Sequence, residues 1–473
     1  TATTEIYTLS LHDALPIWLY LNLPDPENPG KRKYVDFTVE SNVNQNRDPN
    51  KTGRVADIAA FADVDNDGDL DLVTSIYYHR WQMYDSPEED PGDRSEVLLN
   101  DGTGKFTLVN NNGLTDIVAD PNMPAGIINA TGFAFLDYDL DGFVDLYIST
   151  WFSDYAKNLE NNGNGYKMPD VLLKGNGNGT FTKISNNGVQ ISPEPMYGVN
   201  ATDWNNDGWQ DIMTCAYCRS SGSLFKNNQD GTFTDYSTQS GYTGQFIGGD
   251  HGQALCNWEA QPGDFDNDGD MDLLQVQVHG GYDKGEGRTH VTINKGEQEN
   301  YKLVWALDRI RRDAPPSRTH IGDQGGTWID IDADMKLDIA IGQMGYSDAA
   351  NNINMEGQSR LYICMQNDTG YFDDVTKKLG LFYSMQEAHS MEPCDYDLDG
   401  DQDLFVSHQV KDSIAKDTII DGVTKTIYTY YNRMQVSLLR NDIGNKNNWI
   451  SVKLDQPEGA NQGGLGSRVR VFS

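Results

Sequence analysis

The 473-residue sequence has few basic residues and no long apolar run. Lys and Arg number 36 against 71 Asp and Glu, which gives a formal net charge of −35. A protein that binds nucleic acid neutralises phosphates with a cationic face, so this balance argues against nucleic acid as a partner. No apolar stretch reaches the roughly 18 residues that a transmembrane helix needs, so no membrane span is predicted.

Cysteines are also scarce. The density is low and the number is odd, which argues against a disulfide scaffold. Cys215 and Cys218 form one C-x-x-C pair, without the following His of a haem attachment site or the second pair of a zinc site. We therefore interpret the five cysteines as structural: Cys215, Cys218, Cys256, Cys364 and Cys394.

What the sequence does contain is a ten-residue acidic pattern, D-x-D-x-D-G-x-x-D followed by Leu or Ile, repeated six times. Successive copies start 74, 66, 61, 66 and 65 residues apart. A strand-like run follows each copy. A second apolar run with a Gly/Asn turn comes next, as in residues 97–107 and 171–182. The copies start at Asp63, Asp137, Asp203, Asp264, Asp330 and Asp395.

Each repeat therefore contains about four strands in roughly 60 residues, and one such sheet cannot bury both of its faces alone. Radial stacking solves this problem, so we predict an all-β fold. It is a seven-bladed β-propeller of four-stranded antiparallel blades with calcium loops. Residues 18–38 match the second half of a repeat without its acidic pattern, so the first blade is predicted to be incomplete. Residues 1–17 fit no repeat and are interpreted as a non-native or atypical N-terminal segment.

The acidic pattern has the donor set of a calcium loop. Ca²⁺ takes six to eight oxygen ligands, and carboxylates at loop positions 1, 3, 5 and 9 can converge if the chain coils tightly. Position 7 adds its backbone carbonyl, and Gly at position 6 permits the sharp turn. We predict up to six structural calcium ions. The predicted ligands are Asp63, Asp65, Asp67, Asp69, Asp71, Asp137, Asp139, Asp141, Phe143, Asp145, Asp203, Asn205, Asp207, Trp209, Asp211, Asp264, Asp266, Asp268, Asp270, Asp272, Asp330, Asp332, Asp334, Lys336, Asp338, Asp395, Asp397, Asp399, Asp401 and Asp403.

The alternative is an acidic turn that binds nothing. Four crowded carboxylates repel one another without a cation, which favours the metal interpretation. The pattern is not an EF-hand, because position 12 lacks its bidentate Glu. The loop that starts at Asp330 is predicted to bind weakly, since Met335 replaces Gly and a side chain resists a positive φ.

The loops and their hairpins resemble FG-GAP/VCBS repeats, which build integrin-α-like propellers, over residues 18–445. Residues 446–473 resemble the start of an ASPIC/UnbV module through Asn448-Trp449-Ile450 and the run from Gly464 to Val469. That module follows such propellers in the cartilage acidic protein family and its bacterial relatives. The resemblance implies a secreted or surface calcium-binding protein linked to adhesion, and it carries over no catalytic residues.

Three functions remain open from the sequence. The first is an extracellular binding or adhesion module for a protein or glycan. The second is a polysaccharide-active enzyme, in which insertions at 75–95, 151–170 and 408–434 could build a cleft with Trp81, Tyr84, Trp151 and Tyr155. The third is a structural subunit that assembles at a surface.

Overall fold

The structure is a computed structural model, and the descriptions below concern part of the chain. The residues described are 17–51, 53–54, 56, 58–76, 92–118, 125–151, 169–189, 196–216, 222–243, 257–277, 289–312, 321–345, 360–381, 388–420, 423–446, 449–450, 452, 454, 465, 467 and 469.

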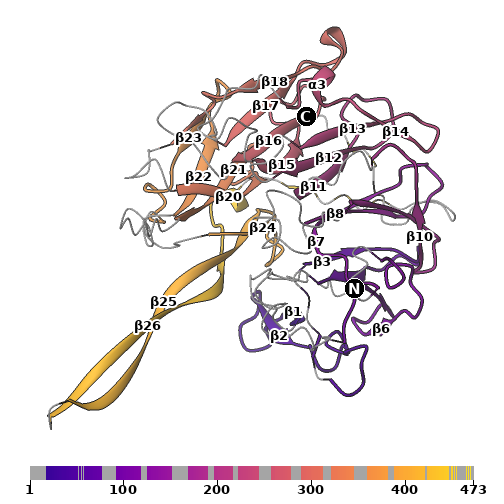
Figure 1. Cartoon of the computed structure of the whole chain (residues 1–473). Coiled ribbons are helices and arrows are strands. Elements are labelled where there is room, and N and C mark those ends of the chain that lie inside the picture. Colours follow the sequence, from indigo (N-terminus) through magenta and orange to yellow (C-terminus); the bar gives the residue numbers. More distant parts are fainter. Residues whose placement is uncertain are drawn as a thin grey trace. The chain divides into compact units, whose positions relative to one another are not determined.

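The described strands form an all-β propeller of about six blades, most of them four-stranded antiparallel sheets (Figure 1). Four sheets follow the chain order strand by strand. They are β3 (Ile58–Ala62), β4 (Asp71–Ser75), β5 (Glu96–Asn100) and β6 (Phe106–Leu108); β7 (Ala130–Leu136), β8 (Asp145–Thr150), β9 (Val171–Gly175) and β10 (Phe181–Ile184); β11 (Met196–Thr202), β12 (Asp211–Ala216), β13 (Ser223–Asn227) and β14 (Phe233–Asp235); and β15 (Asn257–Gly263), β16 (Asp272–Gln277), β17 (His290–Asn294) and β18 (Leu303–Ala306).

Three further sheets depart from this form. The fifth blade gains β19, which pairs parallel to β23. The sixth has three strands, and the first sheet of the chain has two. Their strands are β20 (Ile321–Ile329), β21 (Asp338–Gly345), β22 (Leu361–Gln366), β23 (Phe372–Asp374) and β19 (Ile310–Arg311); β24 (Met391–Cys394), β25 (Asp403–Ile420) and β26 (Val423–Leu439); and β1 (Tyr20–Pro24) with β2 (Arg32–Asp36). The short helices are α3 (Ser237–Ser240), η2 (Glu297–Glu299) and η3 (Gly444–Lys446).

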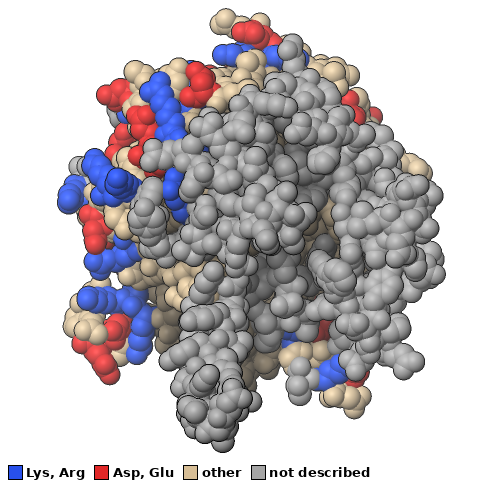
Figure 2. Space-filling model, turned by 60° about the vertical axis from the view of Figure 1, so that its left-hand side comes forward, with Lys and Arg blue, Asp and Glu red and all other residues tan. Residues whose placement is uncertain are grey.

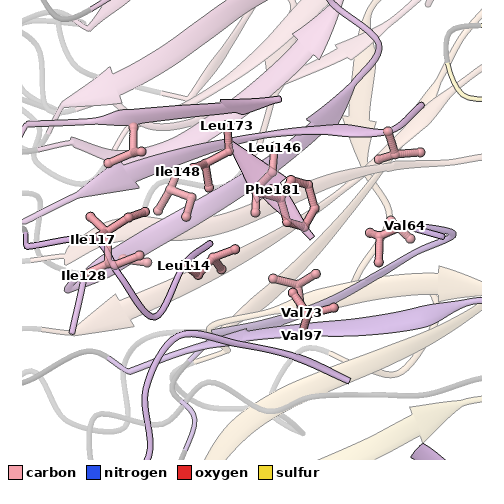
Figure 3. Close-up of a cluster of buried hydrophobic side chains, with 14 of the residues drawn as sticks. Val64, Val73, Val97, Leu114, Ile117, Ile128, Leu146, Ile148, Leu173 and Phe181 are labelled. Carbon is pink, nitrogen blue, oxygen red and sulfur yellow. The ribbon is translucent and has the colours of Figure 1, made fainter. Parts of the chain in front are cut away.

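The second strand of each regular blade is buried along its whole length, as β4, β8, β12 and β16 show. Such strands read as near-continuous apolar or β-branched runs because both faces are covered. Blade packing creates the core. Val73 and Val97 of one blade pack with Leu146 and Leu173 of the next (Figure 3). Each such side chain contributes roughly 1.5–3 kcal/mol by leaving water.

The chain divides into two compact units. Unit 1 comprises residues 1–275, 291–306 and 450–473, and unit 2 comprises residues 276–290 and 307–449. Unit 1 contains the first four acidic loops, and unit 2 contains the last two.

The hairpin of β25 and β26 differs from the sequence interpretation of residues 408–434 as part of a cleft. The two strands pair antiparallel from Leu404 with Leu439 to Ile420 with Val423. They form a long two-stranded ribbon, orange to yellow in Figure 1. An Asp-Gly dipeptide between two β-branched runs is a strong hairpin signal, and residues 421–422 have that sequence. We name residues 409–434 the arm.

The structure tests the fold prediction in part. The strands predicted after each acidic pattern are present, and β1 pairs with β2 where half a repeat was predicted. The sixth sheet has three described strands where four were predicted. Seven blades stay a prediction. In the described part of the chain, no helix is long and apolar enough to cross a membrane. Cys215 and Cys364 are buried and free, and Cys218 lies outside the described residues. The segment 1–17 is described only at Ile17.

Candidate metal sites

All six acidic loops occupy the same place in the fold. Each connects the first strand of a sheet to the second, as the first loop connects β3 to β4. Position 1 directly follows the first strand, and position 9 is the first residue of the second strand. The strand directions therefore fix both ends of the loop, and the chain between them has to coil within seven residues.

The carboxylate at position 1 organises this coil. In the first loop, Asp63 Oδ1 accepts a hydrogen bond from the Asp67 amide at 3.1 Å, and Oδ2 accepts one from the Gly68 amide at 3.0 Å. The other five loops have the same two bonds, accepted by Asp137, Asp203, Asp264, Asp330 and Asp395. Position 1 thus acts as a scaffold as well as a potential ligand.

The carboxylate at position 9 ties the loop to the third strand. Asp71 Oδ2 accepts from the Val64 amide at 2.9 Å, and Oδ1 accepts from the Asn100 amide at the end of β5 at 2.9 Å. This clamp also occurs in every loop. The remaining clamps are formed by Asp145, Asp211, Asp272, Asp338 and Asp403.

Carboxylates converge in five loops. In four of them, ligand atoms at positions 1, 3 and 9 lie within 4.8 Å of one another, and in the sixth loop those at positions 1, 3 and 5 do so. The groups are Asp63, Asp65 and Asp71; Asp137, Asp139 and Asp145; Asp264, Asp266 and Asp272; Asp330, Asp332 and Asp338; and Asp395, Asp397 and Asp399. In the third loop, Asn205 stands in place of the position-3 carboxylate.

The predicted ligands at positions 5 and 7 are hydrogen-bonded to each other within the loop. Position 5 accepts the amide of position 7, as Asp67 Oδ1 does from Asp69 at 3.1 Å. The same bond places the backbone of Phe143 against Asp141 and that of Trp209 against Asp207. The sequence predicted that position 7 contributes its backbone carbonyl as a ligand. The hydrogen bond from the position-7 amide to the position-5 carboxylate orients this residue.

The donor set fits a hard cation. Oδ1 of Asp65, Asp139 and Asp397 is buried and has no hydrogen-bond partner. An unpaired buried carboxylate oxygen is costly unless a cation or a proton meets it. Burial raises the pKa of Asp145 and Asp272 to about 8, despite backbone hydrogen bonds that lower it. Both features suit a loop whose carboxylates face a cation.

A lysine neutralises part of the carboxylate charge in the second loop, at positions 3 and 5. Lys174 on β9 forms an ion pair with Asp139, and its Nζ also lies 2.7 Å from Asp141 Oδ2. Both carboxylates raise the pKa of this ammonium. Lys226 holds the equivalent place on β13, with its Nζ 3.8 Å from Asp207 Oδ2. Sequence reasoning missed both lysines, although each lies at the same offset in a repeated hairpin.

Two positions in each loop adopt a positive φ. Position 6 has φ near 93° at Gly68, and Met335 reaches 68° at the equivalent place. Met335 also donates its amide to Asp330 Oδ2 at 3.0 Å, so the fifth loop keeps the turn that the sequence argued against. Position 4 is left-handed as well, at Asn66, Leu140, Asn206, Asn267, Ala333 and Leu398. Weaker binding in the fifth loop stays a prediction.

Asparagines at the end of the third strand link neighbouring loops. Asn227 donates from Nδ2 to the carbonyl of Tyr138 in the preceding loop at 2.8 Å. Asn294 makes the same bond to Trp204 at 2.9 Å, and Asn441 makes it to Ile331 at 2.6 Å. Each of these asparagines also donates its amide N–H to the position-9 carboxylate of its own loop, so one residue holds two loops.

The sixth loop also contacts the chain that follows the propeller. The Asn445 amide donates to Asp401 Oδ2 at 2.9 Å, and its Nδ2 donates to Asp399 Oδ2 at 3.0 Å. A Cβ at Gly400 would overlap the side chain of Trp449, so only Gly fits there. The residues predicted to begin the C-terminal module thus start directly on the sixth acidic loop.

Surface charge does not distinguish these sites. On the described part of the face in Figure 2, Lys and Arg side chains are interspersed with Asp and Glu. Mixed charge is ordinary for a solvated surface. Burial and convergence of the carboxylates, rather than the net charge, mark the candidate metal sites.

One buried carboxylate outside the loops is neutralised internally. Asp323 on β20 accepts a bidentate pair of hydrogen bonds from Arg312, with Nη1 2.9 Å from Oδ1. Both side chains are 1 % exposed. Thr289 also donates to Asp323, and Gln343 Nε2 donates to Oδ1 at 3.4 Å. This network in unit 2 needs no external cation.

The comparisons with known proteins agree with the repeat. Residues 203–274, which contain the third and fourth acidic loops, match the family profile of the FG-GAP-like repeat. No curated protein matches the chain. This match lies within the β-propeller arrangement of the sheets and covers one of its repeat intervals.

Similar solved structures include two polysaccharide lyases and a hydrolase. The rhamnogalacturonan lyase YesW is 13% identical with a TM-score of 0.31, covering 75% of this chain and 71% of that chain. A Bacillus licheniformis rhamnogalacturonan lyase is 12% identical with a TM-score of 0.32, at the same coverages. A Bombyx mori β-fructofuranosidase is 9% identical with a TM-score of 0.31, covering 59% and 55%. At these TM-scores the matches carry no inference about activity.

Proposed function

We propose that this protein is an extracellular calcium-binding β-propeller that serves as a binding or adhesion module for a protein or glycan. One observation carries the calcium assignment: the same loop of successive blades brings carboxylates together and leaves buried oxygens such as Asp65 Oδ1 without a hydrogen-bond partner. Oxygen-only donors in a flexible loop suit Ca²⁺ better than zinc or other soft metals.

In the first loop, Asp63, Asp65, Asp67 and Asp71 would hold the ion, with the carbonyl of Asp69. The equivalent residues would hold it in the other loops. The ion would supply charge neutralisation, and the chain supplies the geometry through the position-1 scaffold and the position-9 clamp. Because the clamp joins three strands, calcium would stabilise the blade itself, which is a structural role.

The proposed extracellular location follows from the calcium affinity of such loops. Extracellular modules bind calcium at roughly 10⁻⁴–10⁻³ M, which cytosolic calcium would not fill. The adhesion role rests on the resemblance to FG-GAP/VCBS proteins. Within that proposal, residues 18–445 form the propeller and residues 446–473 begin an ASPIC/UnbV module. Trp81, Tyr84 and Tyr155, which the enzyme alternative needed, lie outside the described residues, and Trp151 is buried against Tyr197.

The calcium proposal is tested by titrating Ca²⁺ into metal-free protein in a calorimeter. We expect several equivalents to bind, with Mg²⁺ a poor substitute. Asp65→Ala should remove one site, because it takes away the position-3 carboxylate that converges with Asp63 and Asp71. Asp116→Ala, at an exposed acidic position outside the loops, is the matched control. Binding of no calcium, or equal loss in both variants, would contradict the assignment.

The partner proposal needs a separate experiment. Calcium-loaded protein is applied to arrays of glycans and of extracellular matrix proteins, and the same arrays are repeated in chelator. Calcium-dependent binding supports an adhesion module. Conversion of a polysaccharide without stable binding would instead favour the enzyme alternative.

A further inference from the structure

The arm leaves both of its edges open among the residues that the structure describes. β24 pairs with β25 only from Asp403 to Val406, and the Ser407 amide bonds to the carbonyl of Ser390. From Gln409 to Ile420, no described strand pairs with the outer edge of β25, and β26 is the last strand of its sheet. Figure 1 shows the ribbon continuing well beyond β24.

An open two-stranded ribbon of this length is unusual. An isolated hairpin is at best marginally stable in water, and three or more strands are needed for independent stability. Unpaired N–H and C=O groups along an edge also invite another strand. Of the 26 arm residues, ten are β-branched and three are Tyr, a composition that favours strand pairing.

The order of charged residues in the sequence of β25 favours one particular strand as its partner along this edge. Residues 411–417 read Lys-Asp-Ser-Ile-Ala-Lys-Asp. The pattern is complementary to itself when two copies run antiparallel about Ile414. Lys411 then stands opposite Asp417 of the second copy, and Asp412 stands opposite Lys416 of the second copy.

We propose that two copies of this chain associate through their arms, by antiparallel pairing of β25 with β25 centred on Ile414. The result is a four-stranded sheet in the order β26, β25, β25, β26. The two-fold axis makes the interface self-complementary, so each opposite-charge pair occurs twice. Opposite charges directly across strands are stabilising and like charges are destabilising, which fixes this register against its neighbours.

The net charge of the chain favours the arm as the place of contact. The arm carries four basic and three acidic residues, a net charge of +1. The rest of the chain then carries 32 basic and 68 acidic residues, a net charge of −36. Contact between the acidic parts of two copies would be repulsive, whereas contact between the arms is not.

The test uses charge variants of the full chain, with mass measured by analytical ultracentrifugation in calcium. The wild type should dimerise. Lys411→Asp with Lys416→Asp makes every charged pair acidic, and Asp412→Lys with Asp417→Lys makes every pair basic. Each variant should raise the dimer dissociation constant about tenfold or more. An equimolar mixture of the two variants should form heterodimers.

A compensated variant provides the control. Lys411→Asp together with Asp417→Lys preserves every opposite-charge pair and should dimerise like the wild type. Thermal melts confirm that each variant is folded. A monomeric wild type, or dimerisation unchanged in both like-charge variants, would overturn the proposal. So would an unchanged dimer after the arm is replaced by a short Asn-Gly turn.

Discussion

The acidic loops and the Arg312–Asp323 pair bury carboxylates in two different ways. The charge of Asp323 is neutralised by the guanidinium of Arg312, which belongs to the same chain. Asp145 and its equivalents meet only backbone amides, which orient a carboxylate but do not cancel its charge. The first arrangement needs no external cation, whereas under the calcium proposal the second would make the fold respond to calcium and protons. The following predictions test this difference.

Removing calcium should have the largest effect. Under the calcium proposal, each extracellular-type site would contribute on the order of 1 kcal/mol in millimolar calcium, so up to six loops would contribute about 6 kcal/mol together. We expect the melting temperature to fall by many degrees when calcium is chelated, measured by circular dichroism. Addition of excess calcium should reverse the change. An unchanged melting curve would mean that the loops are neutralised internally, as Asp323 is.

Asp323→Ala should destabilise the protein by about 3–5 kcal/mol, because Arg312 becomes a buried charge without its carboxylate. In contrast to the loops, the loss should be equal with calcium and with chelator. Denaturant unfolding in both conditions measures it. Asp116→Asn serves as the exposed control. If the loss of stability in Asp323→Ala depended on calcium, the difference between the two kinds of buried carboxylate would be contradicted.

Calcium-free protein should lose stability as the pH rises from about 4 to about 8. Burial raises the pKa of Asp145 and Asp272 to about 8 and that of Asp338 and Asp403 to about 7. An acid whose folded pKa exceeds its unfolded value near 3.9 binds its proton more tightly when folded. Its stabilisation is therefore complete below the unfolded pKa and disappears as the pH rises through the folded pKa.

Melting curves at a series of pH values measure this slope. With calcium bound, the ion replaces the protons, so the stability should be nearly constant or should rise over the same range. Equal pH profiles with and without calcium would show that the metal does not interact with these carboxylates.

Met335→Gly should have the smallest effect. The left-handed conformation of Met335 at φ 68° costs roughly 1 kcal/mol or more, partly offset by the greater freedom of Gly in the unfolded chain. We expect a gain of about 0.5 kcal/mol and tighter calcium binding in the fifth loop. Met335→Ala keeps the backbone strain and is the matched control. If both variants behave alike, the strain does not limit this site.

The sequence predicted the repeated parts of this molecule best. Six copies of one pattern locate the loops and the strands that follow them, because the same residues meet the same constraints in each blade. It did not predict the clamp from Asp71 to the Asn100 amide, since a backbone donor has no sequence signature. It did not predict Lys174 either, because a lysine within a strand is ordinary.

The sequence did not predict the arm, for a different reason. Residues 408–434 have no counterpart in the other repeats, so they were interpreted as an insertion. Asp421-Gly422 between β-branched runs was the available signal. The fifth loop shows the opposite error. Propensity argued against a positive φ at Met335, and the hydrogen bonds of the surrounding loop overrode it.

The bonds from Asn227 and Asn294 make the second, third and fourth loops a row of coupled units, and Asn441 couples the fifth to the sixth. Under the calcium proposal, a loop that loses its ion would loosen an anchor of the loop before it. In a one-dimensional array, such nearest-neighbour coupling makes units order and melt together. The propeller would then sense calcium as two collective switches, one for each row, with a response steeper than that of independent sites.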